Sequence, residues 1–295
     1  MIDVISQNRI GVFGATSLVG ASLLPLLAEA GWQAVAFSRQ AVESGLGVEW
    51  RRLPCTEGVE EIPDWICLAP IWVLPDYFAL LEAMGARRIV VLSSTSRFTK
   101  VGSGDTAESV VAARLIDGEA RVRAWAEGRG IEWVILRPTL IYGLGRDKNI
   151  AEMARFIRRF GFFPVLGKAT GLRQPIHAAD VAGACVAALT APEAANRAYN
   201  ISGGETLVYR DMVARVFAAL GRRTRLLTVP LWAFRLALAV LRRLARYRHW
   251  SAAMAERMNR DLVFDHSAAA RDLGFKPRGF ALAAEDLPLV ASGSV

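Results

Sequence analysis

The sequence is poor in the side chains that bind metals, form disulfides or hold nucleic acid. Its 295 residues include three cysteines and three histidines. Cys55, Cys67 and Cys185 are odd in number and widely separated, which excludes a disulfide framework, and with so few histidines we predict no metal site. Lysine occurs only four times, with no lysine-rich tail or interleaved aromatic motif, so we predict no nucleic-acid partner.

Long hydrophobic runs, internal repeats and low-complexity tracts are also missing. No uninterrupted apolar stretch approaches the ~20 residues that span a bilayer. Residues 1–9 are short and polar, which predicts no secretion signal. Together with the scattered cysteines, this leads us to expect a reducing, cytoplasmic location, with attachment to the inner membrane surface left open.

The chain has ample material for a core, since 53% of its residues are hydrophobic. Its length suits one large α/β domain with a smaller lobe. We expect a sheet domain over residues 1–200 and a mainly helical lobe over 201–295, with the two interleaved near 145–180. The net charge of +8 favours acidic or phosphorylated partners.

The stretch from Arg9 to Gly20 has the pattern of a strand, a glycine-rich turn and a helix. Gly14 allows the tight turn, and we expect Gly20 to let the helix pack closely on the strand. Ser17 stands where a second glycine is usual. The first helical N–H groups and the helix dipole then favour a pyrophosphate. The predicted cofactor-binding residues of this turn are Gly14, Ala15, Thr16, Ser17, Leu18, Val19 and Gly20.

The next predicted strand ends in Ser38 and Arg39. In a dinucleotide-binding fold an acidic residue at this position bonds the ribose hydroxyls, whereas a guanidinium suits a 2′-phosphate. We therefore predict NADP(H) in preference to NAD(H). The alternative is that Arg39 is a solvated loop charge.

Strands and helices alternate along most of the chain, which predicts a right-handed, doubly wound parallel sheet of the Rossmann type. Further strands are expected at 48–53, 65–70, 89–92, 131–136 and 198–201. Helices are expected at 76–85, 108–128, 150–160, from 179 and at 209–220, with a loop over 161–172.

Four hydroxyl side chains, Ser93 to Ser96, follow the buried run at 89–92. Ligands in open α/β sheets lie at the carboxyl ends of the strands. These hydroxyls either contact a substrate or cap the next turn, and their position favours the first role.

Six segments in the same order resemble the extended short-chain dehydrogenase/reductase superfamily, which includes the NAD(P)-dependent sugar-nucleotide epimerases and dehydratases. They read GATSLVG at 14–20, VVLSSTS at 90–96, ILRPTLIYG at 135–143, PIHAADVAGA at 175–184, YNISGGE at 199–205 and RDLGFKPRGF at 271–280. The resemblance implies a Rossmann domain, a C-terminal substrate lobe and a cleft between them.

The resemblance also implies roles for individual residues. Ala69 and Pro70 would flank the cofactor, and Pro138 and Thr139 would lie near the nicotinamide. Thr95, with Ser94 beside it, would meet the reacting oxygen. Family members often form dimers through the helices near 80 and 115, so a homodimer is expected.

The sequence departs from the family at its proton-transfer pair. Members that move hydride use a tyrosine four residues before a lysine, whereas Leu81, Arg146, Gly203, Val213 and Ser251 stand four residues after the five tyrosines here. If Glu119 matches the acidic residue that usually follows the lysine, Val111 and Leu115 occupy the pair's positions. Losing a general base costs about 10²–10⁴ in rate.

Four side chains are candidate replacements for that pair: Tyr142, Lys100, Asp105 and His177. Tyr142 matches a family tyrosine near the cleft that is structural in most members. Lys100 lies five residues beyond Thr95 and is either a proton carrier or a surface lysine. His177 fits a hydrogen-bonded position between loop and helix better than a catalytic one.

Residues 230–249 read PLWAFRLALAVLRRLARYRH, with apolar and arginine-rich faces at helical spacing. Three roles stay open: a packed lobe helix with its arginines outward, phosphate binding, or attachment to a membrane surface. We name Arg173, Arg242 and Arg243 as candidate ligands of a substrate phosphate.

Two functions follow from these patterns. The first is an enzyme: an NAD(P)-dependent epimerase, dehydratase or reductase acting on a nucleotide- or lipid-linked sugar. The second is a catalytically silent NADP(H)-binding sensor or assembly factor. The missing tyrosine–lysine pair favours the second, and the full substrate lobe favours the first.

Overall fold

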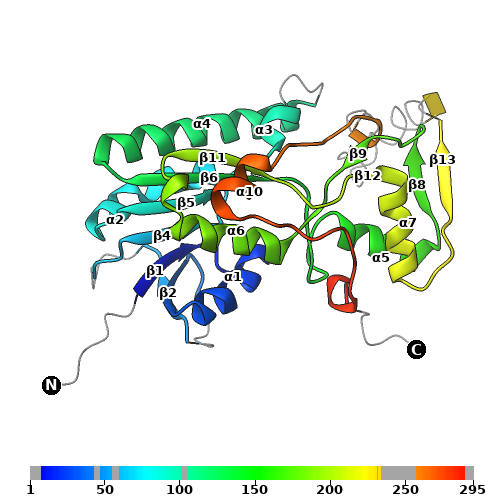
Figure 1. Cartoon of the computed structure of the whole chain (residues 1–295). Helices are drawn as coiled ribbons and strands as arrows, with labels where there is room; N and C mark the ends of the chain where they lie inside the picture. Colours follow the sequence, from blue (N-terminus) through cyan, green and yellow to red (C-terminus); the bar gives the residue numbers. More distant parts are fainter. Residues whose placement is uncertain are drawn as a thin grey trace.

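The structure, a computed structural model, describes residues 8–42, 47–54, 60–100, 105–230, 232–233 and 257–289. Its centre is a seven-stranded sheet in the order β11-β6-β5-β4-β1-β2-β3, parallel throughout (Figure 1). The strands are β1 (Asn8–Phe13), β2 (Trp32–Ser38), β3 (Glu49–Arg52), β4 (Asp64–Cys67), β5 (Arg88–Leu92), β6 (Glu132–Pro138) and β11 (Arg197–Ile201). The doubly wound α/β prediction is confirmed.

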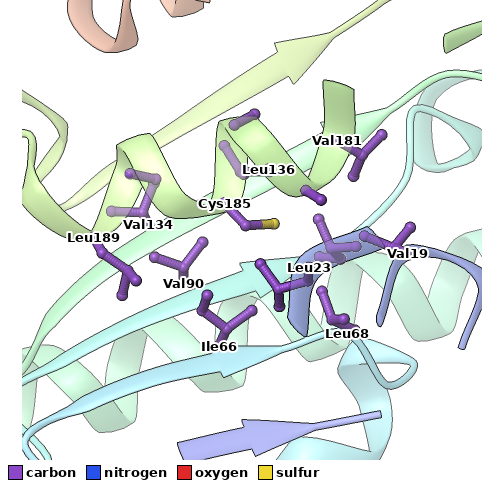
Figure 2. Packing of buried hydrophobic residues seen from close by; sticks show 14 of the residues in the cluster. Val19, Leu23, Ile66, Leu68, Val90, Val134, Leu136, Val181, Cys185 and Leu189 are labelled. Carbon is purple, nitrogen blue, oxygen red and sulfur yellow. The ribbon is translucent and has the colours of Figure 1, made fainter. Parts of the chain in front are cut away.

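Helices cover both faces of this sheet (Figure 1). One face carries α1 (Leu18–Glu29) and α6 (Ala178–Thr190), and the other carries η1 (Ile71–Tyr77), α2 (Phe78–Ala83) and α4 (Thr106–Arg129). All five residues of β5 are buried, as expected for a central parallel strand covered on both sides. Figure 2 shows Val181, Cys185 and Leu189, each one helical turn apart on α6, pointing toward the strands.

The strand order reverses between β1 and β4, which are neighbours in the sheet although β2 and β3 separate them in sequence. Parallel strands on either side of such a switch point leave a crevice beyond their carboxyl ends. In this protein those ends are Phe13 and Cys67, which lie opposite each other in the sheet. The glycine-rich turn begins one residue later, so it lies where ligands of such folds bind.

A second hydrophobic core lies beside the sheet domain, in the lobe on the right of Figure 1. Its helices are α5 (Ile150–Phe160) and α7 (Tyr209–Ala219). Its short strands are β8 (Phe163–Leu166) paired with β13 (Leu226–Val229), and β9 (Leu172–Arg173) paired with β12 (Leu207–Val208). This core takes side chains from both 142–169 and 207–287. The division of the chain at residue 200 stays a prediction.

The remaining elements connect the two cores. They are α3 (Ser96–Thr99), β7 (Ile141–Tyr142) paired with β10 (Ile176–His177), η2 (Pro192–Ala194), α10 (Ser267–Leu273) and η4 (Ala284–Asp286). Among the helices of the described ranges, none is both long and apolar enough to cross a membrane.

Two expectations about local structure are wrong. The predicted loop at 161–172 contains β8 and β9, because β8 is completed by β13, whose first residue lies 63 positions after Phe163 and gives no local signal. The helix expected from Asp76 is preceded by η1, which begins at Ile71, and α2 begins only at Phe78, after Pro75. The helix predicted at 230–249 lies outside the described residues, apart from Pro230, Trp232 and Ala233.

Candidate active site

The glycine-rich turn joins β1 to α1 in a conformation that requires two of its glycines. Gly14 has φ +76°, and a Cβ there would lie 2.6 Å from the backbone nitrogen of Ala69. A Cβ on Gly20 would overlap the backbone carbonyl of Ala15. Gly20 therefore allows α1 to approach the turn itself, whereas we expected it to allow contact with the strand. Ala15 is buried and Thr16 is exposed.

Ser17 is the N-cap of α1, and its Oγ accepts a hydrogen bond from the N–H of Gly20 at 3.1 Å. This bond pairs one of the backbone N–H groups that have no intrahelical acceptor at the N-terminus of a helix. Within the described part of the chain, the N–H groups of Leu18 and Val19 have no acceptor. Both residues line a cavity of about 340 Å³, together with Ala69, Pro70 and Pro138. The start of α1, with its free N–H donors and the positive end of its dipole, thus borders this smaller cavity.

Ser38 and Arg39 lie at the same edge of the sheet as this turn. Phe37 of β2 is opposite Phe13 of β1, so both strands end at one level. Ser38 Oγ accepts from the N–H of Gln40 at 3.2 Å. Arg39 is exposed and forms no ion pair among the described residues. Its guanidinium is therefore available to a ligand phosphate.

A second, larger cavity of about 950 Å³ adjoins the first, and Ser94, Ser96 and Ile141 line both. It extends from the hydroxyl cluster after β5 to the aromatic side chains of α5 in the lobe. The lining that the structure describes includes one carboxylate and six cations: Glu152, and Lys100, Lys148, Arg155, Arg159, Arg173 and Arg257. Such a cavity favours an anionic ligand.

The hydroxyls after β5 are already engaged with the protein. Ser93 donates to Glu119 at 2.6 Å, and Ser94 Oγ accepts from the N–H of Ser96 at 3.1 Å. Thr95 Oγ1 donates to the carbonyl of Pro138 at 3.1 Å, and Thr139 donates to the carbonyl of Gln174. Thr95 therefore presents acceptor lone pairs to the larger cavity. To donate to a substrate oxygen, its hydroxyl has to leave Pro138.

A buried carboxylate holds this region together, and the sequence did not reveal it. Glu119 of α4 is 1% exposed and accepts hydrogen bonds from Ser93 and Arg137, the latter at 3.0 and 2.7 Å. It also pairs with Arg97, and with Arg123 at 3.5 Å. Two signals were available: Arg137, a charged residue near the end of a mostly apolar strand, and Arg123, which stands four residues after Glu119 on α4.

The two side chains that α4 presents to the smaller cavity are apolar, Val111 and Leu115. Lys100, at the end of α3, lines the larger cavity. Burial lowers the pKa of Lys100 below its ordinary value, and the nearby charge of Arg257 adds to the shift.

Two other proton-carrier candidates line neither of these cavities. Tyr142 is fully buried and donates to the carbonyl of Ala281 at 3.2 Å; burial, and then the charge of Asp286, raises its pKa to about 12. His177 caps α6 through Nδ1, which accepts from Ala179, and its Nε2 is 2.9 Å from Asp286. Both side chains are better explained as structural residues.

Of the three arginines predicted to bind a substrate phosphate, the structure describes one, Arg173. Arg173 is 4% exposed, and its guanidinium donates to the carbonyls of Leu172, Arg257 and Arg260 and lies over the ring of Tyr209. Three of its N–H donors thus hold backbone carbonyls, which gives Arg173 a structural role, and its contact with a substrate phosphate stays a prediction. Arg242 and Arg243 lie outside the described residues.

The parallel sheet, the glycine turn at its switch point and the paired cavities define a Rossmann-type α/β protein. Residues 77–202 match the NAD dependent epimerase/dehydratase family. This match covers less than half of the chain; over these residues the chain is similar to that family, which is the resemblance expected from the sequence.

Individual relatives are distant. The UDP-glucose 4-epimerase of Vibrio cholerae is 26% identical over 161 residues, which are 55% of this chain and 47% of that protein. The chain spans about half the length of the first curated relatives it matches.

Solved structures match the fold over nearly the whole chain. The UDP-glucuronic acid 4-epimerase from Bacillus cereus, in complex with NAD, has a TM-score of 0.70 at 16% identity and covers 94% of this chain and 93% of its own. MoeE5 in complex with UDP-glucose and NAD has a TM-score of 0.66 at 20% identity. The match covers 94% of this chain and 95% of the MoeE5 chain.

Proposed function

We propose that the smaller cavity binds a nicotinamide dinucleotide, with its pyrophosphate at the Gly14–Gly20 turn. The observation that carries this proposal is the pair of free N–H groups of Leu18 and Val19, two residues that line one cavity with Ala69, Pro70 and Pro138. Ser17, which lines the same cavity, caps the helix through its Oγ. When bound, this cofactor supplies a hydride acceptor or donor.

We infer a preference for NADP(H) from Arg39. Its exposed guanidinium stands beyond β2, where a carboxylate would favour the free ribose hydroxyls of NAD(H). The related structures in complex with NAD concern those proteins, and the present chain is to be tested with both cofactors.

The larger cavity is proposed to hold an anionic sugar substrate, either nucleotide-linked or lipid-linked. Its cationic lining supports this role. Arg155 pairs with Glu152 at 2.7 Å and Arg257 pairs with Glu108, whereas Lys148 forms no ion pair among the described residues. We assign contacts with substrate phosphate to Lys148 and to Arg159. UDP-sugars occur in the names of the related epimerases, which supports this substrate class.

Lys100 is our candidate for the proton carrier. It lines the larger cavity, as Ser94 and Thr95 do, and its lowered pKa gives it a larger neutral fraction near physiological pH than a solvated lysine has. A neutral Lys100 amine accepts the proton of a substrate hydroxyl as that carbon loses its hydride. Lys100 would become an ammonium in this step, a bound dinucleotide would supply the hydride acceptor, and in the reverse direction the Lys100 ammonium would return the proton to the substrate oxygen.

The second candidate function is a catalytically silent, NADP(H)-binding protein. Val111 and Leu115, which face the smaller cavity from α4, favour it because neither can carry a proton. Absorbance at the nicotinamide band, followed with a panel of UDP-sugars, separates the two. Redox change or sugar turnover supports the enzyme, and tight cofactor binding with neither supports the silent protein.

A further inference from the structure

One end of the lobe is strongly basic and carries no carboxylate. We call residues 158–163 and 222–227 the lobe tip; they read RRFGFF and RRTRLL. The two segments are joined, because the N–H of Phe163 donates to the carbonyl of Arg225 at 2.9 Å and β8 pairs with β13. Arg222 donates to the carbonyl of Ile157 at 2.9 Å, which ties the second segment to the end of α5. In Figure 1, β8 and β13 form the edge of the lobe farthest from the sheet.

The positive charges of the lobe tip are not neutralised by the protein. Its five arginines form no ion pair among the described residues. Arg158 donates to the backbone carbonyl of Pro288, and Arg159 lies over the ring of Phe160. Four of the five are exposed: Arg159, Arg222, Arg223 and Arg225.

Large apolar side chains are exposed in the lobe tip and in chain segments next to it. Phe160 is 49% and Leu227 53% exposed. Leu289, which follows the Pro288 that Arg158 contacts, is 97% exposed, and Trp232 is 73% exposed. The ring of Phe160 lies 4.6 Å from that of Phe156 and 6.3 Å from that of Phe162. Two half-buried aromatic rings thus support the exposed Phe160 ring.

We propose that the lobe tip docks on the surface of an anionic lipid bilayer. Exposed aromatic and aliphatic side chains bordered by arginines are the features with which peripheral proteins enter the headgroup region. Each arginine near an anionic surface strengthens attachment by about fivefold at moderate ionic strength. A nucleic acid would meet the same arginines, but its backbone offers no apolar layer to cover Leu227 and Leu289.

The tip is also continuous with the larger cavity, because Arg159, Phe160 and Phe163 line it. A protein docked through the tip therefore turns the aromatic end of this cavity toward the bilayer. Insofar as the proposed function holds, this arrangement favours a lipid-linked substrate over a freely diffusing nucleotide sugar. Docking itself does not depend on the cofactor or on turnover.

The test is flotation of the full chain with vesicles made of equal parts phosphatidylcholine and phosphatidylglycerol, against pure phosphatidylcholine vesicles. We expect the protein to float only with the anionic vesicles. The variant Arg223→Glu/Arg225→Glu should lose attachment at least tenfold, and Leu227→Ser should weaken it further. The matched controls, Arg114→Glu/Arg121→Glu and Ile116→Ser, change exposed residues of α4 and should attach within about twofold of the wild type.

Four results would overturn the proposal. They are wild-type protein left at the bottom of the gradient, equal losses in the tip and α4 variants, loss of attachment in Arg242→Glu/Arg243→Glu alone, or binding to an oligonucleotide without binding to vesicles. Retention of NADP(H), measured on the same samples, reports on the proposed function separately. Thermal melting of each variant identifies any that fail to fold.

Discussion

Gly14 and Ala69 approach so closely that a Cβ on the glycine would lie 2.6 Å from the alanine's backbone nitrogen. The two residues follow the carboxyl ends of β1 and β4, the strands between which the sheet order reverses. Ala69 also lines the smaller cavity, together with Leu18 and Val19. We therefore expect both the stability of the fold and the proposed cofactor binding to depend on Gly14.

Replacing Gly14 with alanine should therefore cost more than backbone strain alone. A left-handed conformation costs a non-glycine residue about 1–2 kcal/mol. Gly31→Ala is the matched control, since Gly31 has φ +80° and a Cβ there meets nothing within 4 Å. We expect Gly14→Ala to lose about 1–3 kcal/mol more of the free energy of unfolding than Gly31→Ala, measured in urea. Equal losses would mean that the close contact with Ala69 is unimportant.

Arg39→Ala should weaken binding of NADP(H) and leave NAD(H) nearly unchanged. A hydrogen bond to a charged group contributes about 1.5–3 kcal/mol, so the affinity for NADPH should fall about tenfold or more. Calorimetric titration with both reduced cofactors measures the ratio. Arg121→Ala, an exposed arginine on α4, is the control. A loss shared equally by the two cofactors would leave Arg39 as a general surface charge.

Lys100→Met should lower the rate of hydride transfer by about 10²–10⁴, on whichever sugar nucleotide supports turnover, with cofactor affinity unchanged. Because the neutral amine is the base, the wild-type rate should rise with pH through the lowered pKa of Lys100, below its ordinary value of 10.5. Lys100→Arg keeps the charge but cannot lose a proton, so it should be equally impaired at every pH. Full activity in Lys100→Met would remove the assignment.

Tyr142→Phe should keep any turnover, since its hydroxyl is bonded to the carbonyl of Ala281 away from both cavities. Its pKa rises from 10.0 to about 12 on folding, because burial disfavours the phenolate. The neutral tyrosine therefore stabilises the fold fully below pH 10, and this contribution is lost as the pH rises from 10 to about 12.

Over that window the wild type should lose about 2–3 kcal/mol that Tyr142→Phe does not lose. At neutral pH the variant should be about 1 kcal/mol less stable, because the hydrogen bond to Ala281 is missing. Urea unfolding at a series of pH values measures both differences. A strong loss of turnover in this variant, with the fold intact, would return Tyr142 to the catalytic candidates.

Most of the sheet could be predicted because its strands carry their own signals. The apolar run at 89–92 and the strand–glycine–helix pattern at 9–20 are each visible within a dozen residues. The pairing of β8 with β13 could not be predicted, since each strand has only four residues and its partner lies more than fifty residues away. Short strands that depend on a distant partner have no periodicity of their own to detect.

The candidate site divides in the same way. The turn at Gly14–Gly20 and the hydroxyls at Ser93–Ser96 follow directly from motifs. Most of the environment of Glu119 did not, because Arg97 and Arg137 come from α3 and β6 and meet Glu119 only in the fold, whereas Arg123 lies four residues after it on α4. Arg173 had the right charge for a phosphate ligand, but its contacts with three backbone carbonyls depend on residues 172–260, which no local pattern brings together.

The central claim is that the donors of Leu18 and Val19 bind the pyrophosphate of a nicotinamide dinucleotide. Equilibrium dialysis of the full chain against NADPH and NADH tests it most directly, with Gly14→Ala as the impaired variant. The account predicts that the protein retains one molar equivalent of dinucleotide and binds NADPH more tightly than NADH. It also predicts that Gly14→Ala binds both dinucleotides clearly more weakly. If neither dinucleotide is retained at millimolar concentration, the account is contradicted.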